Sequence, residues 1–172
     1  MANENYVEVS PAVYTVLESD LLFPNLVTIT LNRTGNINSA ADIEVLLNGG
    51  SAQQGVDYDI PPGVSQFVTF EPGQTTATFE FEIFDDVDLE GTETIDLLLQ
   101  AFPGNLETVI GNQGTAIVEI LDNEVSNIEF SQPVYSVIES ELISPNLASV
   151  TLTRTGNIYN PAGVDVLIAG GT

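Results

Sequence analysis

The sequence has 172 residues, of which 25 are Asp or Glu and only 2 are Lys or Arg, so its formal net charge at pH 7 is −23. It contains no His and no Cys, which excludes imidazole and thiolate catalysis, disulfide bonds and thiolate zinc sites. Such an acidic chain is repelled by phosphates, so we expect neither nucleic-acid binding nor direct membrane insertion. Its oxygen donors instead suit a hard cation such as Ca²⁺.

Short segments with a period of two predict β-strands along the first 124 residues. Val27, Ile29 and Leu31 alternate with polar residues, as half-buried strands do. In chain order the expected strands are Tyr6–Val9 continuing as Val13–Leu17, then Val27–Leu31, Ile43–Leu47, Phe67–Phe70, Phe79–Phe84, Ile95–Leu99 and Ala116–Leu121. Gly- and Pro-rich turns separate them. The fold class is therefore all-β, an immunoglobulin-like antiparallel β-sandwich of about seven strands.

The chain also repeats itself at a constant offset. Glu18 returns as Glu139 and Arg33 returns as Arg154, 121 residues later in both cases. We interpret the recurring Arg as a structural residue that pairs with an acid on the sheet. The offset predicts a complete domain at residues 1–124 and the N-terminal part of a second, incomplete repeat at residues 125–172.

The incomplete repeat contains the first three strands of a second copy, expected at Ile128–Val137, Ser149–Arg154 and Val164–Ile168. These strands cannot bury their apolar faces by themselves, and unpaired strand edges favour pairing with another chain. We therefore expect self-association through the incomplete repeat or through neighbouring repeats. The alternative is that the sequence is an excerpt from a longer array.

Acidic residues gather where the expected strands end. The densest run, residues 85–93, directly follows the strand ending at Phe84, and Asp122-Asn123-Glu124 follows the last strand of the first copy. Such a run can be a solvated loop. Crowded carboxylates repel one another, however, and a divalent ion relieves that repulsion. An EF-hand is excluded because Leu97 stands where the bidentate Glu would be required, twelfth from Asp86.

Taken in order, these motifs resemble the Calx-beta domain, a calcium-binding β-sandwich. They are Tyr14-x-Val16-x-Glu18, Thr30-x-x-Arg33-x-Gly35, Gly49-Gly50-Ser51-Ala52-x-x-Gly55-x-Asp57-Tyr58, Phe70-x-Pro72-Gly73, Asp85-Asp86-x-x-x-Glu90-x-x-Glu93 and Ile120-Leu121-Asp122-Asn123-Glu124. The resemblance implies that Ca²⁺ is bound at one end of the sandwich. The metal ligands that it implies are Glu18, Asp57, Asp85, Asp86, Asp88, Glu90, Asp122 and Glu124.

The expected function is that of a calcium-stiffened structural or adhesive repeat in a long extracellular or cell-surface protein. A calcium-sensing regulatory domain is the alternative, and calcium affinity separates the two because sensors bind more tightly than extracellular modules. We expect no enzymatic activity, since the carboxylates are clustered as in a cation site and the chain has no Trp to line a glycan cleft. The sequence identifies no protein or glycan ligand.

Overall fold

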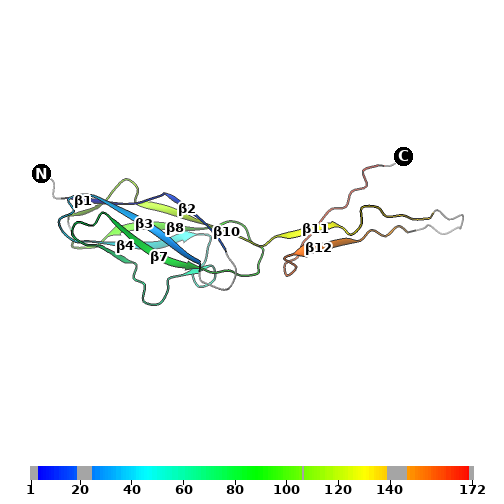
Figure 1. Cartoon of the computed structure of the whole chain (residues 1–172), viewed down its shortest axis with the longest axis horizontal. Helices are drawn as coiled ribbons and strands as arrows, with labels where there is room; N and C mark the ends of the chain where they lie inside the picture. Colours follow the sequence, from blue (N-terminus) through cyan, green and yellow to red (C-terminus); the bar gives the residue numbers. More distant parts are fainter. Residues whose placement is uncertain (1–3, 19–24, 106, 139–146, 171–172) are drawn as a thin grey trace. The chain divides into compact units, whose positions relative to one another are not determined.

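The computed structural model describes residues 4–18, 25–105, 107–138 and 147–170, and it is built from β-strands (Figure 1). These residues belong to two compact units. The first comprises Met1–Asp86 and Glu90–Asn123, and the second comprises Val87–Leu89 and Glu124–Thr172. The strands of the first unit are β1 (Asn5–Val9), β2 (Val13–Leu17), β3 (Asn25–Gly35), β4 (Ala41–Gly50), β5 (Tyr58–Asp59), β6 (Phe67–Phe70), β7 (Thr76–Ile83), β8 (Glu93–Ala101), β9 (Thr108–Ile110) and β10 (Thr115–Leu121).

The first unit consists of two five-stranded sheets with strand orders β5-β7-β3-β1-β9 and β2-β10-β8-β4-β6. This arrangement confirms the predicted immunoglobulin-like sandwich. The two additional short strands, β5 and β9, carry too few residues to show a period of two in the sequence. They form because they lie beside longer strands, since β5 pairs with β7 and β9 pairs with β1.

The core of the sandwich is formed by the apolar residues that alternate with polar residues along the predicted strands. Ile29 on β3 and Phe81 on β7 point inward from one sheet, and Ile95 on β8 points inward from the other. All three are fully buried, while the polar residues between them face outward. Fully burying an aliphatic or aromatic side chain contributes about 1.5–3 kcal/mol, so these inward rows hold the two sheets together.

The N-terminal segment belongs to both sheets. Its first part, β1, pairs antiparallel with β3 and parallel with β9. After residues 10–12 the chain crosses to the other sheet, where β2 runs parallel to β10, with Val13 opposite Ile117 and Leu17 opposite Leu121. Because β2 and β10 run in the same direction, the residues that follow them emerge at the same end of the sandwich.

Arg33 is a structural residue of the core edge, with only 2% of its surface exposed. Its Nε donates a hydrogen bond to Oδ1 of Asn5 (3.2 Å), its Nη2 donates to the carbonyl of Ser39 (2.6 Å), and its guanidinium lies 5.9 Å from the ring centre of Phe70. The partner that we expected to be an acid is thus the amide of Asn5. Burial lowers the pKa of Arg33 from its usual value.

The second unit contains β11 (Ser126–Phe130) and β12 (Leu152–Gly156), which pair antiparallel. Ile128 lies opposite Arg154, and Phe130 lies opposite Leu152. At the offset of 121 residues this is the same register as β1 and β3, where Val7 faces Arg33 and Val9 faces Leu31. The repeat therefore reproduces one ladder of the first unit residue for residue.

Other expected strand residues of the second copy are not in strands. Residues 131–137, 149–151 and 164–168 have no strand conformation. The reason lies in their partners. In the first unit β2 pairs with β10, residues 28–30 of β3 pair with β7, and β4 pairs with β6 and β8. The sequence contains no second copy of those partner strands. Among the described residues, only the ladder whose two strands are both present is formed.

Candidate metal site

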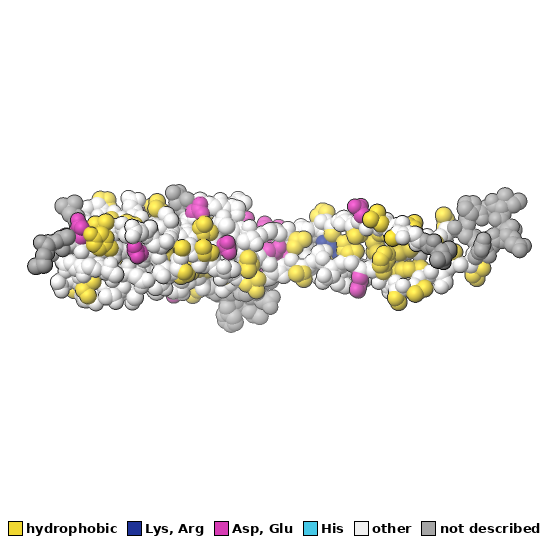
Figure 2. Space-filling model, turned by 90° about the horizontal axis from the view of Figure 1, so that it is seen from above, with side chains coloured by type: hydrophobic (Ala, Val, Ile, Leu, Met, Phe, Trp, Pro, Cys, Tyr) yellow, Lys and Arg dark blue, Asp and Glu magenta, His cyan; other side chains and the backbone are white. Residues whose placement is uncertain are grey.

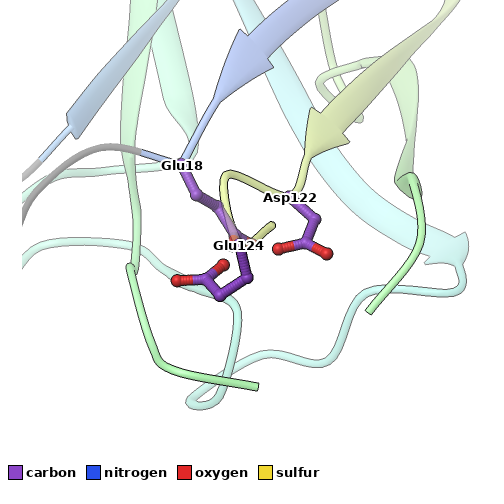
Figure 3. Close-up of side chains that lie close together, drawn as sticks. All are labelled: Glu18, Asp122 and Glu124. Carbon is purple, nitrogen blue, oxygen red and sulfur yellow. The ribbon is translucent and has the colours of Figure 1, made fainter. Parts of the chain in front are cut away.

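The parallel pair β2 and β10 brings a first group of carboxylates together. Glu18 directly follows β2 and is 5% exposed, and its backbone N–H donates to the carbonyl of Leu121 (2.9 Å), which extends the ladder by one bond. Asp122 follows β10. Glu18, Asp122 and Glu124 each present a carboxylate oxygen within 4.8 Å of the others (Figure 3). Two residues 104 positions apart, Glu18 and Asp122, are thus neighbours because their strands end side by side.

A second group comprises Asp57, Asp86 and Glu90, whose carboxylate oxygens also lie within 4.8 Å of one another. Asp57 is 4% exposed and fixed on both sides. Its Oδ2 accepts the backbone N–H of Gln53 (2.6 Å), and its carbonyl accepts the N–H of Phe84 (2.9 Å) at the end of β7. These bonds place the Asp57 loop against the start of the acidic loop.

The two groups are joined by hydrogen bonds of the first unit. The backbone N–H of Glu90 donates to Oδ2 of Asp122 (2.9 Å). The side chain of Asn123 donates both to Oδ1 of Asp85 (2.6 Å) and to the carbonyl of Glu18 (2.8 Å). An amide at position 123 can donate these two bonds, whereas a carboxylate there could not. Asn123 therefore holds two acidic segments together without adding charge.

Glu93 is a member of this cluster that our ligand set omitted. It is the first residue of β8, and its pKa is raised to about 7. The causes, in decreasing order, are burial, the charge of Asp57 and a hydrogen bond with Asp57, followed by the charges of Glu90 and Asp86. Its Oε2 is buried and has no hydrogen-bond partner among the described residues. In the sequence, the spacing Glu90-x-x-Glu93 is the feature that could have indicated that Glu93 belongs to the cluster.

The two remaining predicted ligands, Asp85 and Asp88, lie outside both groups of three. Asp85 is half-buried and accepts the bond from Asn123, but it belongs to neither group of three. Asp88 is exposed and is also outside both groups. Asp59, two residues from Asp57, accepts hydrogen bonds from Gln54 and from the N–H of Ile60, which lower its pKa. The structure therefore brings together six of the eight predicted ligands in two groups and adds Glu93.

This donor set fits a hard divalent cation. Every side-chain donor is a carboxylate oxygen, which Ca²⁺ prefers, and the buried Oε2 of Glu93 would gain a partner from a bound ion. The pKa of Glu93 is raised first by burial and then by the charge of Asp57, so both the loss of solvent and the neighbouring charges disfavour its ionised form. A cation at this end of the sandwich would offset the repulsive part of that shift.

Comparisons with known proteins agree with this arrangement. The Calx-beta domain family model matches residues 2–124. FRAS1-related extracellular matrix protein 2 of Homo sapiens is 30% identical over 131 residues, covering 74% of this chain and 4% of that protein. Sodium/calcium exchanger 1 of Bos taurus is 28% identical over 149 residues, covering 76% of this chain and 15% of the exchanger.

A solved structure shows the same fold. The crystal structure of the apo-form Calx CBD1 domain superimposes with a TM-score of 0.59 at 25% identity, covering 70% of this chain and 99% of that domain. The crystal structure of the calcium binding domain CBD12 of CALX1.1 gives a TM-score of 0.59 at 26% identity, covering 79% of this chain and 51% of that chain. The chain spans only 4% and 15% of the two curated relatives above. With a family match over residues 2–124, this chain belongs to the Calx-beta domain family.

Proposed function

We propose that this chain is a calcium-binding structural repeat of an extracellular or cell-surface protein, and that Ca²⁺ stiffens the end of the sandwich where β2 and β10 terminate. The observation that carries the proposal is the cluster of Asp57, Asp86 and Glu90, whose carboxylate oxygens lie within 4.8 Å of one another. Asp57 is almost fully buried. Crowding a buried carboxylate against two others is costly, and a bound cation is the compensation that this fold family suggests.

The relatives support the extracellular setting. Two of them are named as extracellular matrix proteins, from Homo sapiens and from Lytechinus variegatus, and the second aligns with 96% of this chain at 26% identity. Among the described residues no helix is long and apolar enough to cross a membrane. The repeat at an offset of 121 residues supports an array of similar domains. The matched domain type binds ligands rather than catalysing reactions, and we propose no enzymatic role.

A calcium-sensing role is the second candidate, and the similarity to sodium/calcium exchanger 1 favours it. The two roles require different affinities. Sensors bind Ca²⁺ with dissociation constants of roughly 10⁻⁷–10⁻⁵ M, whereas extracellular modules bind at roughly 10⁻⁴–10⁻³ M. The charge of −23 favours the structural role, because an extended array of acidic domains needs cations to limit self-repulsion.

Isothermal titration calorimetry with Ca²⁺, and with Mg²⁺ as a competing hard cation, tests the proposal. We expect a dissociation constant near 10⁻⁴–10⁻³ M for a structural module. Asp86→Asn should weaken binding at least tenfold. Glu80→Gln is the matched control, because Glu80 lies on the exposed face of β7. Absence of binding, or equal effects of the two substitutions, would contradict a defined site.

A further inference from the structure

The outward faces of the two sheets of the first unit differ in chemistry. On one sheet the outward side chains at the middle of β3 and β7 are polar: Thr28, Thr30, Asn32, Thr76, Thr78 and Glu80. On the other sheet every strand has an apolar side chain at an outward position: Val13 on β2, Leu46 on β4, Phe67 on β6, Leu98 on β8 and Ile117 on β10. The two sheets bury their inward faces against each other, so these outward residues are apolar in a closed sandwich.

Four of these apolar side chains are neighbours in the centre of the sheet. Val13 lies directly opposite Ile117, and Leu98 lies directly opposite Leu46. Ile117 and Leu98 are diagonal neighbours, because Leu98 pairs with Thr115, two residues before Ile117, and diagonal side chains remain within reach of each other. A hollow of about 340 Å³ lies here, lined by residues of β8 and β10 that include Leu98 and Ile117. The centre of the sheet therefore presents an apolar, slightly hollowed surface.

The row continues to the edge strand of the sheet. Phe67 lies directly opposite Glu44, so it is the diagonal neighbour of Leu46, which is the next outward residue of β4. The ring of Phe67 meets the ring of Phe102 edge to face, with 5.6 Å between the centroids, and this contact fixes its position. Single exposed apolar residues are common, whereas a contiguous row is a feature of interaction surfaces. We call this row the apolar stripe; it consists of Val13, Ile117, Leu98, Leu46 and Phe67.

Carboxylates lie on both sides of the apolar stripe. Asp96 is directly opposite Ile117, and Glu119 is the next outward residue after Ile117 on β10. On the other side of the stripe, Asp42 and Glu44 occupy the outward positions of β4 that precede Leu46. The stripe is thus bordered by two acidic residues on each side.

This charge pattern indicates the occupant. The sequence has only two basic residues, the buried Arg33 and Arg154 in the second unit. Figure 2 accordingly shows Asp and Glu side chains, but no Lys or Arg, on the visible described surface of the first unit. The same face of a second copy would set carboxylates against carboxylates. The complementary surface is instead an apolar stripe bordered on both sides by Lys or Arg.

An amphipathic α-helix has this form, and an extended strand does not. Successive side chains of a strand point to opposite faces, so a strand lying on the stripe would direct its charged residues away from the acids. A helix presents an apolar stripe with polar side chains along both of its borders. The apolar stripe crosses all five strands of the sheet. At about 4.8 Å between neighbouring strands it is at least about 19 Å long, the length of about 13 helical residues.

From these observations we propose that the apolar stripe is a docking site for a basic amphipathic helix of a protein partner. The apolar side chains of the helix lie along the stripe. Its Lys or Arg side chains pair with Asp42 and Glu44 on one side and with Asp96 and Glu119 on the other. The docking site is separate from calcium binding, because it contains none of the proposed metal ligands.

Fluorescence anisotropy of a labelled synthetic peptide with the whole 172-residue chain tests the proposal, at about 0.15 M salt to screen weak attraction between exposed charges. The probe is a helical Leu/Lys peptide of about 14 residues whose Leu residues form one stripe. We expect saturable one-to-one binding. A second peptide, in which Ser replaces every Leu, keeps the charge and should bind roughly tenfold more weakly because it buries no apolar surface. No saturable binding of the probe, or equal binding of the two peptides, overturns the proposal.

Matched variants locate the binding surface. Leu98→Ser should weaken binding of the Leu/Lys peptide roughly fivefold. Leu26→Ser is the control, because Leu26 is also an exposed Leu of the first unit but lies on the other sheet, and it should leave binding unchanged. Both residues are exposed, so neither substitution removes a core side chain. Equal effects of the two substitutions would mean that the peptide does not bind along the stripe, and the proposal would be wrong.

A charge test and a test for a different occupant complete the experiment. The double variant Glu44→Gln with Asp96→Asn should weaken binding, whereas Glu80→Gln with Glu82→Gln, on the other sheet, should not. Equal losses would indicate general attraction to an acidic chain and contradict a defined site. If sedimentation velocity shows that the chain dimerises and that Leu98→Ser abolishes the dimer, the occupant is a second copy and helix docking is wrong. Calcium titration of Leu98→Ser should match the original chain, so failure here leaves the proposed function untouched.

Discussion

Replacing Asp57 by Asn should have opposite effects on stability with and without calcium. Asn retains an oxygen that can accept the N–H of Gln53, so the local turn is preserved, but it removes one charge from the cluster. Without calcium, the substitution removes like-charge repulsion with Asp86 and Glu90, whose oxygens lie within 4.8 Å. At an effective dielectric constant of 20, one such pair at 4.8 Å costs about 3.5 kcal/mol, and solvent screening of the exposed Glu90 reduces this to about 1 kcal/mol.

With calcium in hundredfold excess over its dissociation constant, the original chain gains about 2.7 kcal/mol from binding. Asp57→Asn should lose most of that gain. In a domain of this size, 1 kcal/mol corresponds to a change in Tm of roughly 4 °C. We therefore expect the variant to melt about 4 °C higher than the original in chelator and several degrees lower in calcium. Differential scanning calorimetry with Glu80→Gln as control measures both. A variant whose Tm differs from the original by the same amount and sign in both buffers would refute the reasoning.

Of three further predictions, two concern the surroundings of the site and one concerns Arg33 at the edge of the core. Without calcium, stability should fall as the pH rises from about 5 to 8, because the pKa of Glu93 is about 7 in the folded state against an ordinary 4.5 and only the folded state keeps that proton. Urea midpoints should show the fall, and Glu93→Gln should flatten it. Asn123→Ala removes two hydrogen bonds and should cost about 1–3 kcal/mol of unfolding free energy by urea denaturation; an unchanged value would mean that Asn123 does not join the two segments. Arg33→Met leaves the carbonyl of Ser39 without its charged donor and should cost about 3 kcal/mol by the same assay, whereas a cost under 1 kcal/mol would assign no structural role to the guanidinium.

The sandwich was predictable because its signal is local. A strand such as β7 alternates polar and apolar residues along eight residues, and that period fixes which side chains enter the core before any tertiary contact is known. The short strands β5 and β9 carry no such signal, because two or three residues become a strand only when a longer one lies beside them. The same physical reason explains residues 164–168, which match part of β4 at the offset of 121 residues but have no partner strand among the described residues and form none.

The site was predictable from spacing but not in its geometry. Matching motifs predicted Asp57 and Asp86 as ligands, and the structure places their carboxylates in one group that could hold a metal ion. The sequence did not indicate that the pKa of Glu93 is raised. This shift depends on burial and on the charge of Asp57, which is far away in the chain. Likewise, Asn123 lies between two acidic residues in the sequence and has no predicted role there. In the structure it is a donor to two acidic segments.

The parallel pairing of β2 and β10 has a mechanical consequence. When a chain is stretched, tension enters through the segment before Val13 and leaves through the segment after Leu121. The two strands are then pulled in opposite directions along their length, so five opposed residue pairs from Val13–Ile117 to Leu17–Leu121 resist sliding together rather than opening one at a time. Glu18 and Asp122 are the next residues on these two strands. An ion bound between them would cross-link the two strands at the end of this ladder. The force needed to unfold the domain would then depend on the calcium concentration.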